Sequence, residues 1–223
     1  MVHNRGGEAC TRTFALGDSR ALPEAWSALR AGQLVAFPTD TVYGLGCDLW
    51  QPEAIVRLYR AKDRPRNLAI PVLVSAPKHV YQVAARLPPL FEEAIRRYWP
   101  GALTLIVPRR PAVPDMLCDG GPTVAVRMPD HSLALELIEG MGGTLAATSA
   151  NLSGHLPAIT AQRVLAELCG RVAVVLDGGK CSGGVASTIV DLVRDPPVLL
   201  RQGHLSLEAL REALPALVLG AGQ

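Results

Sequence analysis

The sequence predicts an α/β protein, a single domain built on an open, twisted, mixed sheet with helices on both faces. Helical and strand-like segments alternate along the 223 residues, which is typical of this fold class. Several strand-like segments are apolar throughout instead of alternating, which indicates a sheet covered on both faces. We find no internal repeat and no linker, and the proline-containing stretch 108–122 is expected to be a long loop.

Helices are expected where apolar residues share one face and a proline or a capping hydroxyl lies near the first turn. In the segment Pro52–Lys62, for example, Ile55, Leu58 and Tyr59 fall on one face. Thr160 and Ser206 are expected to cap two later helices. In chain order the predicted helices are Leu22–Ala31, Pro52–Lys62, Pro89–Trp99, His131–Gly140, Thr160–Cys169 and Ser206–Leu214.

Strands are expected where short apolar runs are bounded by proline, glycine or polar residues. Leu34–Phe37, which ends at Pro38, is the clearest of them. The predicted strands are Leu34–Phe37, Ile70–Val74, Ala102–Val107, Thr123–Arg127, Gly143–Ala147, Val172–Leu176, Thr188–Leu192 and Val198–Leu200.

Composition excludes several classes of protein. Hydrophobic residues make up 49% and charged residues 19%, which excludes a disordered chain. The net charge of +2 excludes a polycationic nucleic-acid binder, so an anion site must be local. Aromatic residues, at 4%, are too few for a base-stacking platform.

The cysteines and the apolar runs bear on the compartment. The five cysteines form no CxxC pair, which predicts neither a zinc site nor a redox dithiol, and their odd number suggests reduced thiols. No apolar run approaches the roughly 20 residues that span a bilayer, and the N-terminus lacks the apolar core of a secretory signal. We therefore expect a cytoplasmic protein without a membrane partner.

Polar loops next to predicted strands and helices are the candidate sites, because ligands of open α/β sheets bind at the carboxyl ends of strands. The loop 38–46 supplies two threonines and two glycines, although Thr39 and Asp40 could simply satisfy their own turn. The cations of 62–67 could hold a polyphosphate, or they could be solvated at a helix C-terminus. Arg127 either pairs with a core carboxylate or points into a cleft.

Two further segments carry hydroxyl and amide groups. The loop 148–154 could bind a ligand or form a turn or cap. The segment 187–191 is followed by Arg201 after the last strand, and Asp191 could be only an ion-pair partner. The sequence contains no phosphate-binding loop, dinucleotide fingerprint, nucleophile elbow or convincing nucleophile–base pair. These absences favour a reaction that runs by positioning and electrostatics.

Taken in order, the segments PTDTVYGLG, KDRPRN, TVAVRMPDH, TSANLSG, STIVD and LRQG resemble the YrdC-like threonylcarbamoyl-AMP synthases. The resemblance extends from about Leu22 to Gly203, and the chain looks like the short form without an additional C-terminal domain. It implies a twisted sheet with a concave cationic cavity. The expected boundaries are an N-terminal tail at 1–13, a catalytic domain at 14–215 and a C-terminal tail at 216–223.

The resemblance also implies an activity. L-Threonine, bicarbonate or CO2, and ATP would yield threonylcarbamoyl-AMP and pyrophosphate, and a separate transferase complex would pass the threonylcarbamoyl group to tRNA. Mg²⁺ is expected with ATP, although no carboxylate cage is visible, and no tightly bound cofactor is expected. The implied catalytic residues are Lys62 and Arg64. The implied ATP contacts are Arg64, Asn67, Thr123, Ser149, Asn151 and Arg201, and the implied threonine contacts are Thr41, Arg127, Thr148 and Ser187.

One position departs from the family pattern. Many members read NPL after the KxR pair, followed by a histidine that contacts threonine, whereas this chain has Asn67-Leu68-Ala69 and no histidine there.

Two other functions are compatible with the motifs. The first is a module that binds double-stranded RNA or tRNA in the same cavity, against which the low charge and few aromatics argue. The second is a domain that handles carbamoyl phosphate, which we rank last.

Overall fold

The computed structural model describes residues 10–220, so most of the predicted N-terminal tail and the last three residues of the C-terminal tail lie outside the described residues. Within that range the strands are β1 (Arg12–Ala15), β2 (Val35–Phe37), β3 (Gly44–Cys47), β4 (Val72–Val74), β5 (Leu103–Pro108), β6 (Thr123–Arg127), β7 (Thr144–Ser149), β8 (Val174–Asp177), β9 (Thr188–Asp191), β10 (Val198–Arg201) and β11 (Val218–Leu219). The α-helices are α1 (Ala21–Arg30), α2 (Pro52–Ala61), α3 (Phe91–Tyr98), α4 (Ser132–Glu139), α5 (Ala161–Leu168) and α6 (Leu207–Arg211). Two short 3₁₀ helices cover Pro77–Gln82 and Asp115–Leu117.

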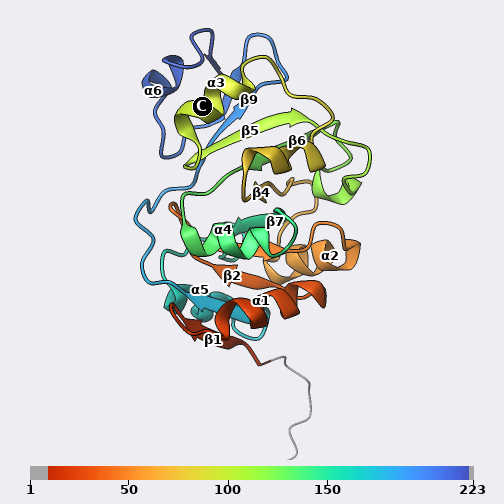
Figure 1. The fold of residues 1–223 in the computed structure, drawn as a ribbon, viewed down its shortest axis with the longest axis vertical. Coiled ribbons are helices and arrows are strands. Elements are labelled where there is room, and N and C mark those ends of the chain that lie inside the picture. Colours follow the sequence, from red (N-terminus) through yellow and green to blue (C-terminus); the bar gives the residue numbers. More distant parts are fainter. Residues whose placement is uncertain (1–9, 221–223) are drawn as a thin grey trace, which may run out of the picture.

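The strands form one sheet in the order β1-β8-β2-β3-β7-β4-β6-β5-β9-β10-β11. Parallel pairs such as β4 with β6 occur beside antiparallel pairs such as β3 with β7, so the sheet is mixed, as predicted. In Figure 1 the order runs upward, from β1 at the lower end to β9, α3 and α6 at the upper end.

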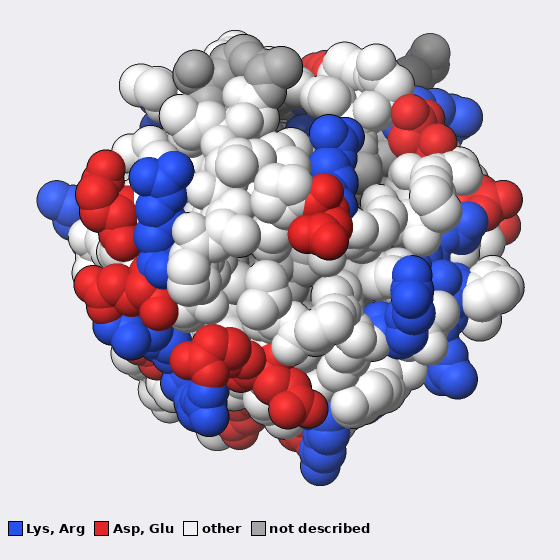
Figure 2. Space-filling model, turned by 90° about the horizontal axis from the view of Figure 1, so that it is seen from above, with Lys and Arg blue, Asp and Glu red and all other residues white. Residues whose placement is uncertain are grey.

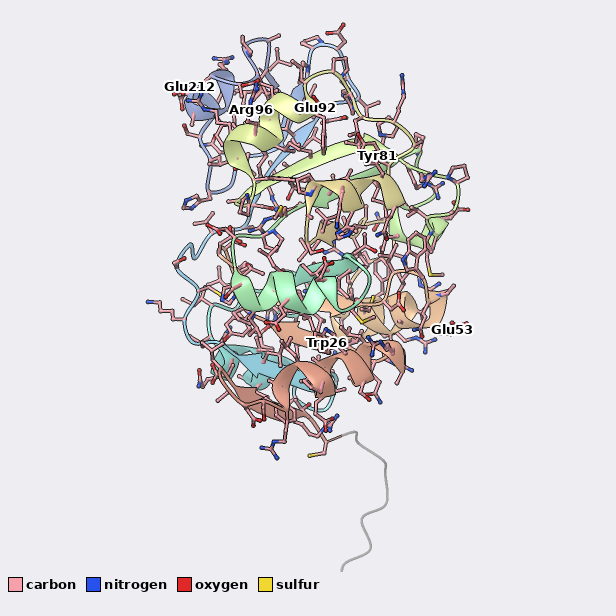
Figure 3. All side chains as sticks on the ribbon, in the orientation of Figure 1. Trp26, Glu53, Tyr81, Glu92, Arg96 and Glu212 are labelled. Atoms are coloured by element: carbon pink, nitrogen blue, oxygen red, sulfur yellow. The ribbon has the colours of Figure 1, made fainter. Side chains whose placement is uncertain are left out.

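Helices cover both faces of the sheet, which confirms the prediction from the apolar strands. In β2, Val35 and Phe37 pack with α1 and α4, whereas Ala36 belongs to the core on the other face. Trp26 of α1 lies on the side of this helix that faces α4 (Figure 3). Its indole Nε1 donates a hydrogen bond to the carbonyl oxygen of Leu137 in α4 at 3.0 Å.

α1 and α4 cover only part of one face of the sheet, and the same face is open where β5 and β6 lie. In β5, Leu103 and Leu105 pack into the core that includes α2, α3 and α5, so Thr104 points to the opposite face. The same alternation places Val126 of β6 in that core and turns Arg127 away from it. The open part of this face therefore presents Thr104 of β5 and Arg127 of β6.

Three strands were absent from the prediction. β3 has the sequence GLGC, and glycine is normally depleted in strands. β1 and β11 are short strands at the two edges of the sheet, where little apolar pattern is needed. β1 begins at Arg12 and β11 covers Val218–Leu219, so both segments expected to be tails contribute residues to the sheet.

Each of the five cysteines is a free thiol. Within residues 10–220 no helix is both long and apolar enough to cross a membrane.

Candidate active site

A cavity of about 220 Å³ lies over the open part of the sheet. Side chains in the middle of strands line it, including Leu73, Thr104 and Ile189, so it sits on the face of the sheet and not only at strand ends. Seven of the residues implied by the resemblance line this cavity: Thr41, Arg64, Arg127, Thr148, Ser149, Ser187 and Arg201.

Arg127, at the end of β6, is buried and held on three sides. Its Nε donates to the carbonyl oxygen of Gly101 at 2.9 Å, its Nη1 to Thr41 Oγ1 at 2.9 Å, and its Nη2 to Asp40 Oδ1 at 2.6 Å. Asp40 Oδ1 also accepts the main-chain N–H of Asp130 at 3.1 Å. Both alternatives for Arg127 therefore hold together, because it pairs with a carboxylate and lines the cavity. One N–H on each terminal nitrogen has no acceptor within the described residues.

Arg201, at the end of β10, is held by Ser187. Its Nε and Nη2 donate to the carbonyl oxygen of Ser187 at 3.1 and 2.8 Å, and Nη2 lies 3.3 Å from Ser187 Oγ. Ser187 Oγ is in turn 2.8 Å from Thr104 Oγ1. One of the hydroxyls of Ser187 and Thr104 donates its hydrogen to the other. The hydroxyl that accepts this bond keeps its own hydrogen, which has no acceptor within the described residues. The pair can therefore donate one hydrogen bond to a ligand in the cavity.

Arg64 follows the end of α2. Its Nε and Nη2 donate to the carbonyl oxygens of Leu68 and Ala69 at 3.3 and 3.0 Å. Burial lowers the pKa of Arg64. Burial also lowers the pKa of Arg201, and the positive charges of Arg127 and Arg64 lower it further. The effect of Arg127 and Arg64 on Arg201 indicates that the three guanidinium groups lie near one another. Among the described residues, only Arg127 of the three has a carboxylate partner.

Little negative charge lies beside these groups at the cavity. No Asp or Glu lines it, and in the described part of the chain neither Arg64 nor Arg201 forms an ion pair. Residues 10–220 contain no group of three or more His, Cys, Asp or Glu side chains able to hold a metal ion. The described side chains therefore offer no carboxylate cage for Mg²⁺.

Lys62 does not line the cavity. Its side chain is only 1% exposed, and its Nζ donates to the carbonyl oxygens of Ser149 and Asn151, behind the cavity wall. Burial, and to a smaller extent Arg64, lowers the pKa of Lys62 to about 7. Asn151 is also buried behind the wall, where its Nδ2 donates to the carbonyl oxygens of Leu152 and His155.

Two further predicted residues are not brought to the cavity. Asn67 is exposed in the loop after α2. Thr123 begins β6, roughly 13 Å from Arg127 at about 3.3 Å per residue, because the two residues occupy opposite ends of the same strand. The position of neither residue supports an ATP contact.

Two contributors to the site were not predicted from the sequence. Thr104 is a hydroxyl in the middle of an otherwise apolar strand, and that interruption was a readable signal. The sequence predicts only a turn role for Asp40, because its pairing with Arg127 joins residues 87 positions apart in the chain, which no local pattern encodes. Thr39 does serve the turn, because its Oγ1 accepts the N–H groups of Thr41 and Val42.

Comparison with known proteins decides the family. The Sua5/YciO/YrdC family model, described as "Telomere recombination", matches residues 27–203. The chain belongs to this family. The resemblance to YrdC-like proteins is therefore confirmed.

Relatives within the Sua5/YciO/YrdC family differ in length. The chain is 41% identical over 186 residues to the threonylcarbamoyl-AMP synthase of Pyrococcus abyssi, covering 83% of this chain and 55% of that protein. It is 38% identical over 168 residues to the threonylcarbamoyl-AMP synthase of Methylococcus capsulatus, covering 74% of this chain and 89% of the relative. The chain thus spans about half of the first relative and most of the second.

A solved structure of the same family agrees in fold. The crystal structure of P. abyssi Sua5 complexed with L-threonine matches with a TM-score of 0.90 and 36% identity, over 94% of this chain and 62% of that one. The mixed α/β fold is therefore confirmed.

Proposed function

We propose that this protein is an L-threonylcarbamoyladenylate synthase, a nucleotidyltransferase that forms threonylcarbamoyl-AMP and pyrophosphate from L-threonine, bicarbonate or CO2, and ATP. The observation that carries the proposal is the convergence of Arg64, Arg127 and Arg201 on one cavity without an acidic lining residue. The relatives named as threonylcarbamoyl-AMP synthases support the choice of reaction.

Arg64 and Arg201 are the proposed contacts of the triphosphate. Main-chain carbonyls hold both side chains, so their positive charge is not cancelled by a carboxylate. ATP carries about four negative charges, which must be offset before an anionic nucleophile can approach the α-phosphorus. Ser149, at the end of β7, adds a hydroxyl at the cavity wall.

Arg127 is the proposed contact of the threonine carboxylate. Each terminal nitrogen keeps one N–H without a partner among the described residues, and a carboxylate can accept from both. Thr41 and Asp40 fix the guanidinium plane. Thr148 and the Ser187 hydroxyl supply further polar contacts for the amino acid.

The reaction then needs orientation more than covalent help. The threonine amine adds to CO2 and releases a proton to solvent, which gives a carbamate. A carbamate oxygen attacks the α-phosphorus, and the bond from that phosphorus to the pyrophosphate oxygen breaks. Arginine side chains fixed in advance offset charge that moves from the carbamate to the leaving pyrophosphate. Mg²⁺ enters with ATP as part of the substrate.

The proposal extends to the use of the product and to the location of the protein. We propose that a downstream transferase uses the product to modify tRNA and that the protein is cytoplasmic. A cavity of about 220 Å³ has room for a small ligand but not for a segment of double-stranded RNA. Figure 2 shows charges of both signs interspersed on the upper end of the molecule, so that face offers no continuous basic surface.

The test is pyrophosphate release by the purified protein. The proposal predicts release only when threonine, bicarbonate and ATP are all present, and threonylcarbamoyl-AMP as the second product. Release without threonine, or no release under any combination, would contradict it. Carbamoyl phosphate offered in place of threonine and bicarbonate tests the carbamoyl-phosphate alternative.

A further inference from the structure

We propose that Lys62 is a positioning residue, which fastens the loop 149–153 to the end of α2 and so places Ser149 at the cavity wall. The reading of Ser149 as part of the nucleotide site rests on the proposed function. The attachment of the loop can be tested without substrate.

Lys62 holds the loop at three points. Its Nζ donates to the carbonyl oxygens of Ser149 and Asn151, and its own carbonyl oxygen accepts the N–H of Ser153 at 2.9 Å. These contacts bind both ends of a tight loop to one residue of the α2 terminus. Glu167 of α5 also holds this loop, because its Oε2 accepts the N–H of Leu152 at 2.9 Å.

The surroundings of the ammonium group favour this role over a contact with phosphate. Lys62 is 1% exposed, and it forms no ion pair with any described carboxylate. A buried cation without a carboxylate needs hydrogen-bond acceptors in fixed positions. The two loop carbonyls supply them, so the loop and the lysine stabilise each other.

The end of α2 explains why Lys62 and Arg64 act in different places although only one residue separates them. Asp63 has a left-handed backbone with φ of 50°. The N–H of Asp63 donates to the carbonyl oxygen of Arg60 at 3.2 Å. The N–H of Arg64 donates to the carbonyl oxygen of Tyr59 at 3.0 Å. This is the Schellman ending of a helix, which turns the chain sharply after the cap residue. The turn leaves Lys62 against the loop and brings Arg64 to the cavity.

The experiment compares Lys62→Met with Arg64→Met, which makes the same replacement two residues away. Amide hydrogen exchange is measured on the free proteins, with the amides of α4 as an internal reference, and ATP affinity is measured separately. We expect Lys62→Met to speed exchange of the Leu152 and Ser153 amides about tenfold or more, because local opening becomes easier. Arg64→Met should weaken ATP binding and leave these amides within about twofold of wild type.

Unchanged exchange in Lys62→Met, together with an ATP affinity as low as that of Arg64→Met, would overturn the proposal and make Lys62 a phosphate ligand. If Lys62→Met does not fold, Lys62→Gln carries the test, because Gln keeps two N–H donors and has no charge. Loop protection and ATP affinity near wild type in Lys62→Gln support positioning. Intact loop protection with ATP affinity reduced to that of Arg64→Met overturns it. Since exchange needs no substrate, failure here is distinguishable from absence of pyrophosphate release by the wild type.

Discussion

Main-chain carbonyls, and not carboxylates, hold the cavity-facing side chains of Arg64 and Arg201. A carbonyl fixes the direction of a guanidinium group without neutralising it, so the full charge remains available to a ligand. Arg127 is different, because Asp40 offsets part of its charge. This difference matches the proposed ligands, a polyphosphate for the first two side chains and a single carboxylate for the third.

Arg64→Ala should lower kcat/KM for ATP by more than tenfold, because the loss of one buried charge contact costs roughly 2–5 kcal/mol. Arg60→Ala is the matched control, since Arg60 lies exposed on the last turn of α2. Steady-state pyrophosphate release measures both. Near-normal activity in Arg64→Ala would contradict the proposed phosphate contact.

Thr104→Val should raise the KM for the substrate that accepts the free hydroxyl hydrogen by about tenfold, the effect of one hydrogen bond of roughly 1.4 kcal/mol. Thr104→Ser keeps the hydroxyl and should restore most of the affinity. Kinetics with each substrate varied in turn identify which one is affected. Unchanged KM values for all substrates in Thr104→Val would show that the pair is only structural.

Lys62 should make stability depend on pH. Its pKa is lowered to about 7 in the folded protein from an ordinary 10.5, so between these values the unfolded chain binds more protons. The free energy of unfolding should therefore rise with pH across this window, at most by roughly 1.4 kcal/mol per pH unit. Denaturant unfolding of wild type and Lys62→Met between pH 7 and 10 measures the difference. Parallel curves for the two proteins would exclude the lowered pKa.

At the scale of elements, β3 shows why part of the fold could not be predicted. A Cβ added at Gly46 would lie 2.7 Å from Leu145 Cδ2 and 2.9 Å from Phe37 Cε1. The glycines make room for side chains from the neighbouring strands β2 and β7, and these contacts exist only after the sheet has formed. Local propensity therefore predicts a loop where tertiary packing produces a strand.

Gly46→Ala should destabilise the protein by about 1–3 kcal/mol, the usual cost of overpacking a core. Gly44→Ala should cost less, because its Cβ would meet only the Phe37 ring, at 3.0 Å or more. Urea unfolding of both variants checks the order. A Gly46→Ala variant as stable as wild type would contradict the packing argument.

The helices and the central strands were predictable because their signals are local. Thr160 and Ser206 cap their helices as expected, each accepting a main-chain N–H three residues on. β6 has the bounds that the sequence predicts. The strand order was not predictable, since it depends on contacts between distant segments. The same limit applies to the site, where motif order indicated seven cavity residues but not that Lys62 and Asn151 lie behind the wall.

For the molecule as a whole, the uneven covering of the sheet produces the site. α1 and α4 close one part of a face, and the remainder stays open above β5, β6 and β9. Loops from both halves of the chain then surround this opening, from the β2–β3 loop to the end of β10. The cavity therefore depends on the complete fold and not on any one motif.

The most direct test of this account is a crystal structure of the protein with L-threonine and a non-hydrolysable ATP analogue. We predict the triphosphate against Arg64 and Arg201 and the threonine carboxylate on the terminal nitrogens of Arg127. A nucleotide bound outside this cavity, or threonine bound away from Arg127, would contradict the account.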